Sequence, residues 1–472
     1  MTDTKLYLVE SDKGEEALFD NITPIEGTSL EVTYETDGTF RTKDNSIAAY
    51  KGKSTNDYEL SVISHKVHVE NLDKGKAYSY KIGSEQGWAY GAFMVEEDAP
   101  ASFTAIQMSD AQTKDPSKLN VWRNTFSKAI EKVGRGSVDT ILYNGDQFDQ
   151  NISRVNSSDQ YKPNRLLSFA KSLDVIYDYK MDIPYMASSG NHERTAPYSQ
   201  YLLGDINYAG YAATGCYYSY DYNFAHFVVL DSYDVTTEEI NWLKNDLDSA
   251  SGAKWKIVML HISPYSTGDN SNSSDNQHIV EKLTPIFSSK HVDLVLQAHD
   301  HTYNKTLPYK WDAAGYTTEW HNEEVVKFNV KTTKKNGIVY DKNPQGTYYV
   351  TTGAAGHRCG ASESDGVWAE VVNDNGEWKG LNPNKTFLSN KYKTECGALK
   401  YDNQYESYKV SSYTSAQNYK KGDLATGNVN AQMFGVLNVN QKTLSYNAYT
   451  VEMKDQQNSD IKLFDSVDVW KD

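Results

Sequence analysis

Beyond residue 102 the chain alternates short apolar runs with longer runs whose apolar residues recur at helical spacing. The apolar runs have the length of buried strands and lie at 103–108, 139–143, 183–187, 227–230, 255–260 and 292–297. The intervening helical patterns lie at about 121–133, 166–179, 237–250 and 276–288. Strands that alternate with helices are typical of an α/β fold in which helices cover mixed sheets.

Five of these predicted strands are followed directly by a cluster of polar residues. The clusters are 109–112, 145–149, 190–193, 260–264 and 298–301. In an α/β sheet the crevice beyond the carboxyl ends of the strands is where ligands bind. Any one cluster could be an ordinary polar turn or a buried histidine. Together, in order, they indicate that Asp, Gln, Asn and His side chains meet at one rim, and such donors are typical of a two-metal site.

The two ends of the chain have the pattern of β-structure. Residues 1–100 contain short alternating segments separated by Gly, Asp and Asn, which predicts an all-β sandwich. Residues 101–472 form the second predicted domain, which returns to strands at 346–352, 434–439 and 444–449. A chain of 472 residues is long enough for two domains.

An aromatic segment at about 357–432 interrupts the second domain like an insertion. It begins just after a predicted strand, and it is rich in Trp, Tyr, Asn and Ser. One interpretation is that it forms one side of the cleft where the polar clusters meet and selects which substrate binds there. The alternative is that its aromatic rings pack on the β-sandwich or on one another.

Charge and cysteine content limit the partners and the compartment. The formal net charge of −16 argues against a nucleic acid or an anionic membrane as partner, because both require a basic face. Neither a transmembrane-length apolar run nor a signal peptide is visible. The three cysteines have no zinc-finger spacing, and whether Cys359 and Cys396 pair stays open.

The ordered motifs D-x-Q, GDxxD, GNHE, H and HxH resemble the signature of the calcineurin-like metallophosphoesterases over about residues 102–465. The N-terminal segments resemble the fibronectin-III-like domain that precedes the catalytic domain of purple acid phosphatases. The resemblance, to a bacterial branch of that group, implies a four-layer α+β sandwich of two mixed sheets flanked by helices. It also implies a bacterial protein that is secreted or held at the cell surface.

The same resemblance implies roles for individual residues. Asp146 would bridge two metal ions. The other ligands implied are Asp110, Gln112 and His301 at site one, and Asn191, His261 and His299 at site two. A hydroxide between the metals would attack phosphorus, and His192 would protonate the leaving group with Glu193 orienting its ring. Arg194 and His357 are candidates for contact with substrate, with ordinary surface positions as the alternative.

Three positions depart from the family pattern. Asp149 stands where purple acid phosphatases have the tyrosine that gives them their colour, Gln112 replaces the usual histidine, and Ala298 replaces the usual glycine. Charge balance without a tyrosinate favours two divalent ions, drawn from Fe, Mn, Zn or Ca. The amide oxygen of Gln112 favours Mn, Fe(II) or Ca over Zn at site one.

These observations predict hydrolysis of a phosphate ester, most directly a monoester, on a small phosphorylated substrate. A phosphodiesterase would use the same metals with a different pocket wall. A hypothesis from another class is a catalytically weak cell-surface binding module that uses the sandwich to bind carbohydrate or a cell wall. The sequence does not specify the metal, the natural substrate or the oligomeric state.

Overall fold

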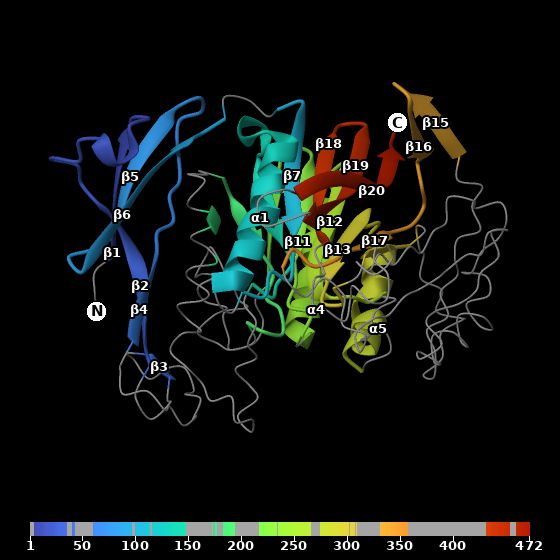
Figure 1. Ribbon diagram of the computed structural model, residues 1–472, viewed down its shortest axis with the longest axis horizontal. Helices are drawn as coiled ribbons and strands as arrows, with labels where there is room; N and C mark the ends of the chain where they lie inside the picture. Colours follow the sequence, from blue (N-terminus) through green and yellow to red (C-terminus); the bar gives the residue numbers. More distant parts are fainter. Residues whose placement is uncertain are drawn as a thin grey trace.

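A computed structural model gives the arrangement of most of the chain (Figure 1). The residues that it describes are 4–34, 40–42, 60–96, 100–113, 116–147, 172, 175–176, 183–193, 217–233, 235–265, 274–301, 303–306, 308, 331–356, 431–453 and 459–472. The predictions that fall outside these residues concern Asp149, Arg194, His357, the three cysteines, most of the helix expected at 166–179, and the segment 357–430.

The N-terminal part is an antiparallel β-structure at one end of the molecule (Figure 1). Its elements are β1 (Thr4–Glu10), η1 (Gly14–Glu16), β2 (Ile25–Tyr34), β3 (Phe40–Thr42), β4 (Leu60–Lys66), β5 (Ala77–Ser84) and β6 (Gly87–Met94). The order is β3-β2-β1-β5-β6, and β4 also pairs with β2. Strand β2 pairs with β1 through residues 25–27 and with β4 through residues 28–34. The fibronectin-III-like assignment and the boundary at residue 100 stay predictions.

A six-stranded sheet forms one half of the second part of the chain. Its strands are, in spatial order, β10 (Tyr218–Tyr222), β11 (Ala225–Val229), β12 (Trp255–Ile262), β13 (Leu294–Ala298), β17 (Tyr348–Thr352) and β14 (Tyr303–Lys305). Strands β11, β12, β13 and β17 are parallel. They are buried on both faces, which explains why their sequences are almost continuously apolar.

An eight-stranded sheet forms the other half. Its strands are, in spatial order, β15 (Lys331–Lys335), β16 (Ile338–Lys342), β20 (Ser459–Trp470), β19 (Thr443–Met453), β18 (Ala431–Asn440), β7 (Ser102–Met108), β8 (Thr140–Tyr143) and β9 (Tyr185–Ala187). Strands β7, β8 and β9 are parallel, whereas β18 runs antiparallel to β7. The carboxyl ends of β7, β8 and β9 therefore lie at the same edge.

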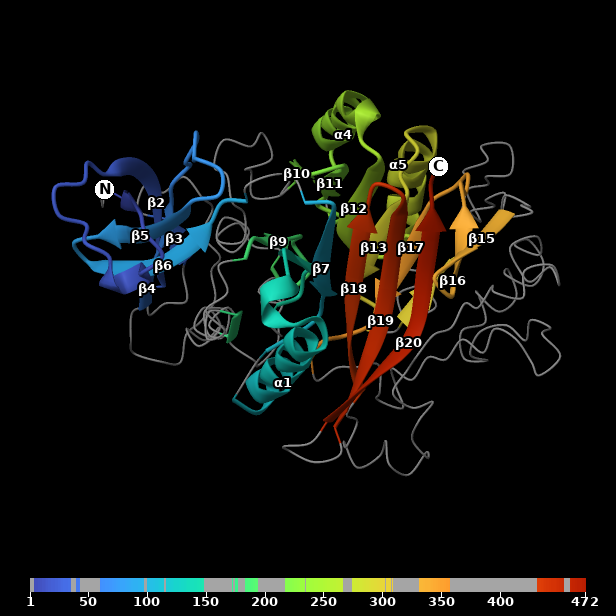
Figure 2. The same ribbon diagram turned by 90° about the horizontal axis from the view of Figure 1, so that it is seen from above.

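The helices cover the outer faces of the two sheets, and the sheets pack against each other (Figure 2). The helical elements are α1 (Pro116–Val133), η2 (Arg135–Ser137), α4 (Thr237–Ser249), η3 (Ala250–Gly252) and α5 (Ser274–Ser289). Phe126 of α1 packs on the eight-stranded sheet, whereas Leu243 of α4 and Phe287 of α5 pack on the six-stranded sheet. Phe103 and Phe227 fill the core between the sheets. The predicted four-layer sandwich is confirmed.

Within the described part of the chain, we find no helix with the length and apolar character that crossing a membrane requires.

A buried histidine joins the β10–β11 hairpin to α4. His226 is only 4% exposed, and its two ring nitrogens lie 2.8 Å from carboxylate oxygens of Asp221 and Asp246. Burial lowers the pKa of His226, but the hydrogen bonds and charges of the two carboxylates raise it above the ordinary value. The charged form of His226 therefore stabilises the folded state fully below about pH 6.5, and this contribution is lost as pH rises through the raised folded-state pKa of His226.

We expect His226→Gln to lower the free energy of unfolding by about 1.5–3 kcal/mol at pH 6, the usual contribution of hydrogen bonds to charged groups, and by less at pH 9. Urea unfolding at the two pH values measures the difference. His68→Gln is the control, because His68 is exposed and its partner is the exposed Glu70. An equal loss of stability at both pH values would contradict the charged state of His226.

Candidate metal centre

The two sheets bring the predicted ligands together at one edge of the sandwich. Asp110 and Gln112 follow β7, Asp146 follows β8, and Asn191 follows β9, all in the eight-stranded sheet. The histidines come from the six-stranded sheet: His261 lies at the end of β12, and His299 and His301 follow β13. The carboxyl ends of parallel strands from both sheets thus meet, as the order of the motifs predicts.

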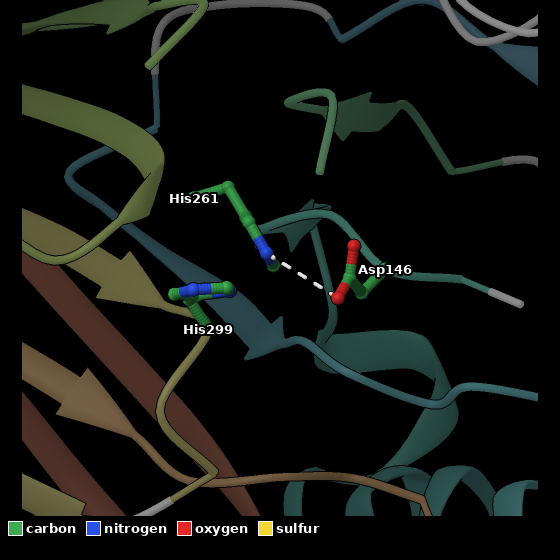
Figure 3. Close-up of side chains that lie close together, drawn as sticks. All are labelled: Asp146, His261 and His299. Atoms are coloured by element: carbon green, nitrogen blue, oxygen red, sulfur yellow. Dashed lines mark ion pairs between the residues drawn. The ribbon is translucent and has the colours of Figure 1, made fainter. Parts of the chain in front are cut away.

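Two groups of side chains have the spacing of metal ligands. Asp146, His261 and His299 form the first group, shown in Figure 3, and Asp110, Asp146 and His301 form the second. Within each group the ligand atoms lie within 4.8 Å of one another. Asp146 belongs to both groups, which is the position expected of a bridging carboxylate.

The two amide side chains join these groups. Asn191 Oδ1 lies 3.0 Å from His261 Nε2, beside the first group. Gln112 Nε2 lies 3.1 Å from Asp146 Oδ2. All seven residues of the predicted ligand set are therefore in or beside the two groups, while their binding of metal stays a prediction.

Two buried acceptors at this place have no hydrogen-bond partner among the residues that the structure describes. Asp110 Oδ1 and Gln112 Oε1 are buried, and neither accepts a hydrogen bond from any residue that the structure describes. His301 Nε2 lies 3.4 Å from Asp110 Oδ1, which is the distance of an ion pair. Buried oxygens without donors are costly unless a cation compensates them. With imidazole, amide and carboxylate donors around one point, the residues present fit divalent cations.

Five of the seven predicted ligands have a left-handed backbone. Their φ angles are 52° at Asp110, 43° at Gln112, 55° at Asp146, 74° at His299 and 49° at His301. This region is sparsely populated by residues other than glycine, and each such residue costs about 1–3 kcal/mol. Such strain persists where the surroundings fix it, and it is concentrated at functional sites. Here the left-handed residues lie directly after β7, β8 and β13.

Two glycines allow the strand ends to approach closely. Gly145 has φ of +82°, and a Cβ there would lie 2.7 Å from both His261 Nδ1 and the backbone nitrogen of Gly190. A Cβ on Gly190 would lie 2.2 Å from Asp146 Oδ1. Both contacts are shorter than any side chain tolerates, so the glycines of GDxxD and GNHE are required by packing around Asp146.

The role expected for Glu193 is wrong. Its buried carboxylate accepts hydrogen bonds from the backbone nitrogens of Asp146 (2.7 Å), Gln147 (2.6 Å) and Gly190 (2.9 Å). His192 Nδ1 has no hydrogen-bond partner within the described part of the chain. Glu193 therefore fixes the turn that carries Asp146, instead of orienting the His192 ring. The sequence GNHE places the two residues side by side, but it does not show which groups the carboxylate reaches.

Burial and charge set the protonation of the centre. Burial raises the pKa of Asp146, but His192, His261 and His299 outweigh this effect and hold the pKa below its ordinary range. Burial lowers the pKa of His261, yet Asp146, Asp110 and the carbonyl of Asn144 raise it to about 10. Burial and the neighbouring His261 lower the pKa of His299. A cation that binds His261 must therefore displace a proton from it.

Comparison with known proteins agrees with this geometry. Residues 104–303 match the family model described as calcineurin-like phosphoesterase. Acid phosphatase type 7 of Mus musculus is 24% identical over 326 residues, which cover 62% of this chain and 64% of the mouse protein. Purple acid phosphatase 18 of Arabidopsis thaliana is 27% identical over 136 residues, covering 26% of this chain and 31% of the plant protein. The chain thus spans less than two thirds of these relatives.

Two solved structures share the fold. The purple acid phosphatase PPD1 from seeds of yellow lupin, Lupinus luteus, superposes with a TM-score of 0.55 at 14% identity, covering 100% of this chain and 70% of the lupin chain. The structure of PhoD gives a TM-score of 0.51 at 12% identity, covering 100% of this chain and 88% of that chain. Residues 104–303 are therefore similar to the calcineurin-like phosphoesterases, and the chain is related in sequence to acid phosphatases and shares the fold of the purple acid phosphatases.

Proposed function

We propose that the protein hydrolyses phosphate monoesters at two divalent cations held by the seven predicted ligands. The observation that carries the proposal is the shared position of Asp146, which belongs to both three-residue groups. Fe, Mn, Zn and Ca are the candidate metals. The family match and the acid phosphatase relatives support a phosphatase over the binding-module hypothesis.

The charges of the residues suit an anionic substrate. Two bound dications supply Lewis-acid activation of water and of the phosphoryl group. Only Asp110 and Asp146 among the seven predicted ligands are carboxylates, whereas the others bind as neutral donors. The two carboxylates therefore leave net positive charge at the centre, and that charge attracts a phosphate although the whole chain is acidic.

The surroundings of His192 support its proposed role as proton donor to the leaving group. Its side chain is 12% exposed, and Nε2 lies 3.5 Å from Asp146 Oδ2 and 3.4 Å from Gln112 Nε2. The ring is thus beside the candidate ligands and still reachable from solvent. Its backbone nitrogen donates a 2.9 Å hydrogen bond to Asp146 Oδ1, which fixes where the residue stands. A histidine so placed is suited to general acid catalysis.

Metal analysis combined with paired substrates tests the proposal. Protein purified without added metal is analysed for metal content, and its kcat/KM is then compared for 4-nitrophenyl phosphate and bis(4-nitrophenyl) phosphate. We expect two metal ions per chain and a higher kcat/KM for the monoester. A higher value for the diester would instead assign a phosphodiesterase. Absence of both metal and turnover, after metal has also been supplied, would favour the binding module.

The protein is expected to be colourless in the region where purple acid phosphatases absorb. Asp149, at the position of the tyrosinate, lies outside the described residues, but two nearby phenols are engaged elsewhere. Tyr143 OH accepts a 2.8 Å hydrogen bond from the nitrogen of Ala111, and Tyr303 OH donates to Asp465 at 3.2 Å. Burial raises the pKa of both phenols well above the ordinary value, so both stay protonated. The visible absorption spectrum of concentrated, as-isolated protein tests this expectation, and a violet sample would contradict it.

A further inference from the structure

Asn144 is a buried polar residue directly between strand β8 and the turn that carries Asp146. It is 0% exposed and follows the four fully buried residues Thr140–Tyr143. A buried amide requires partners for its donors and its acceptor, because a buried polar group without them is costly. The partners of Asn144 come from three other strands.

The side chain of Asn144 connects the two sheets beneath the candidate metal centre. Its Nδ2 donates to the carbonyl oxygens of Leu260 and Leu296, each at 3.0 Å, and its Oδ1 accepts from Gln107 Nε2 at 2.8 Å. Gln107 is in β7 of the eight-stranded sheet, whereas the two leucines are in β12 and β13 of the six-stranded sheet. Leu260 is the residue before His261, and Leu296 is three residues before His299. One amide thus holds the strands that deliver His261, His299 and His301.

The backbone of Asn144 sets the orientation of the His261 ring. Its carbonyl oxygen lies 2.6 Å from His261 Nδ1, and a carbonyl can only accept, so Nδ1 carries the proton. Nε2 then faces Asn191 Oδ1 at 3.0 Å and Asp146 Oδ2 at 3.4 Å, two oxygens to which it can only donate, so a bound cation would take the place of the Nε2 proton. This is the usual arrangement of a ligating histidine, whose second nitrogen is held by a carbonyl or carboxylate.

We propose that Asn144 is a positioning residue of the metal centre, because its amide fixes the ends of β12 and β13 against β8 and thereby holds His261 with Nε2 facing Asp146. The inference rests on the dinuclear centre of the proposed function. Asp110 and Gln112 follow β7 and receive no hydrogen bond from this amide. Loss of the amide releases the ends of both β12 and β13, which affects His261 and His299 at site two but only His301 at site one. The site of His261, His299 and Asn191 is therefore weakened more than the site of Asp110, Gln112 and His301.

Binding of Mn²⁺ by the full chain tests this positioning role. Asn144→Leu removes the amide at similar volume, and Asn144→Ser keeps one small donor if the leucine variant does not fold. Thr347→Val is the matched control: the Thr347 hydroxyl is also buried and donates to the carbonyl of Val292 at 2.7 Å, but at the opposite end of the six-stranded sheet. Titration followed by electron paramagnetic resonance distinguishes a spin-coupled pair of ions from a single ion.

We expect the unmodified protein and Thr347→Val to bind a coupled pair of Mn²⁺ ions. In the folded Asn144 variant, one ion is expected to bind as before and the second about 10–100-fold more weakly, as is typical when a group behind a metal ligand is lost. A coupled pair of unchanged affinity in that variant, or equal weakening of both ions, would overturn the positioning role alone. Failure of the unmodified protein to bind two ions would overturn the dinuclear centre itself, and the inference with it.

Discussion

Asp146→Ala is expected to lose both metal ions and all turnover above background. The Asp146 carboxylate is buried and belongs to both groups of potential ligands, so its removal takes one ligand from each site. Loss of a group behind a ligand typically weakens metal binding 10–100-fold, and loss of a shared ligand should weaken both ions more than about 100-fold. Metal content after dialysis and hydrolysis of 4-nitrophenyl phosphate measure the two losses.

Asp139→Asn is the matched control for this variant. Asp139 immediately precedes β8, at the end away from Asp146, and its carboxylate accepts a 2.7 Å hydrogen bond from the nitrogen of Thr104. An asparagine oxygen can still accept that bond, so the strand should stay in place with metal content and turnover unchanged. If folded Asp146→Ala keeps one tightly bound ion, or keeps substantial turnover, Asp146 does not bridge the centre.

The strands that carry the candidate ligands could be predicted because they are buried on both faces. The expected runs 103–108 and 255–260 lie within the observed Ser102–Met108 and Trp255–Ile262. Parallel strands between two layers require apolar side chains in almost every position, so each strand is visible as a continuous run that ends where polar ligands begin. The placement of the motifs at one edge then follows from the parallel direction of the strands.

The pairing of strands from distant parts of the chain could not be predicted in the same way. Strand β18 pairs with β7, with Gly435 opposite Gln107, although helices and most of the other strands lie between them in sequence. The apolar run at 434–439 predicts a strand, and it lies within the observed Ala431–Asn440, but the run carries no information about which strand is its neighbour. The expectation of two mixed sheets came from the resemblance to a known family and not from the run itself.

The residues that hold the candidate ligands in place could also not be recognised from the sequence. Asn144 precedes GDxxD and looks like an ordinary turn residue there, but its amide spans two sheets. Glu193 looks like a partner of the adjacent His192, but three backbone amides take its carboxylate. Such roles depend on which backbone groups converge in space, because peptide nitrogens and carbonyls occur at every position. Left-handed φ values at Asp146 and His299 likewise could not be read from the sequence, because Asp and His adopt them more often than most residues but still at only a small minority of positions.

His192→Ala is expected to separate substrates by their leaving groups. General acid catalysis typically contributes about 10²–10⁴-fold, so the variant should lose that much kcat on an alkyl phosphate, whose alkoxide requires a proton. The loss should be smaller on 4-nitrophenyl phosphate, because nitrophenolate leaves without protonation. Alanine retains the backbone nitrogen that donates to Asp146 Oδ1, so metal content should be preserved.

The ratio of the two losses is what identifies the role of His192. A histidine that only stabilised charge on the phosphoryl oxygens would affect both substrates alike, since that charge does not depend on the leaving group. His291→Ala serves as the control, because His291 is exposed in the turn after α5, and it should leave both rates unchanged. The nitrophenyl group removes the need for a proton on the leaving oxygen and changes nothing else that His192 could supply. Equal losses on the two substrates, with metal content intact, would therefore contradict the acid role and leave an electrostatic role.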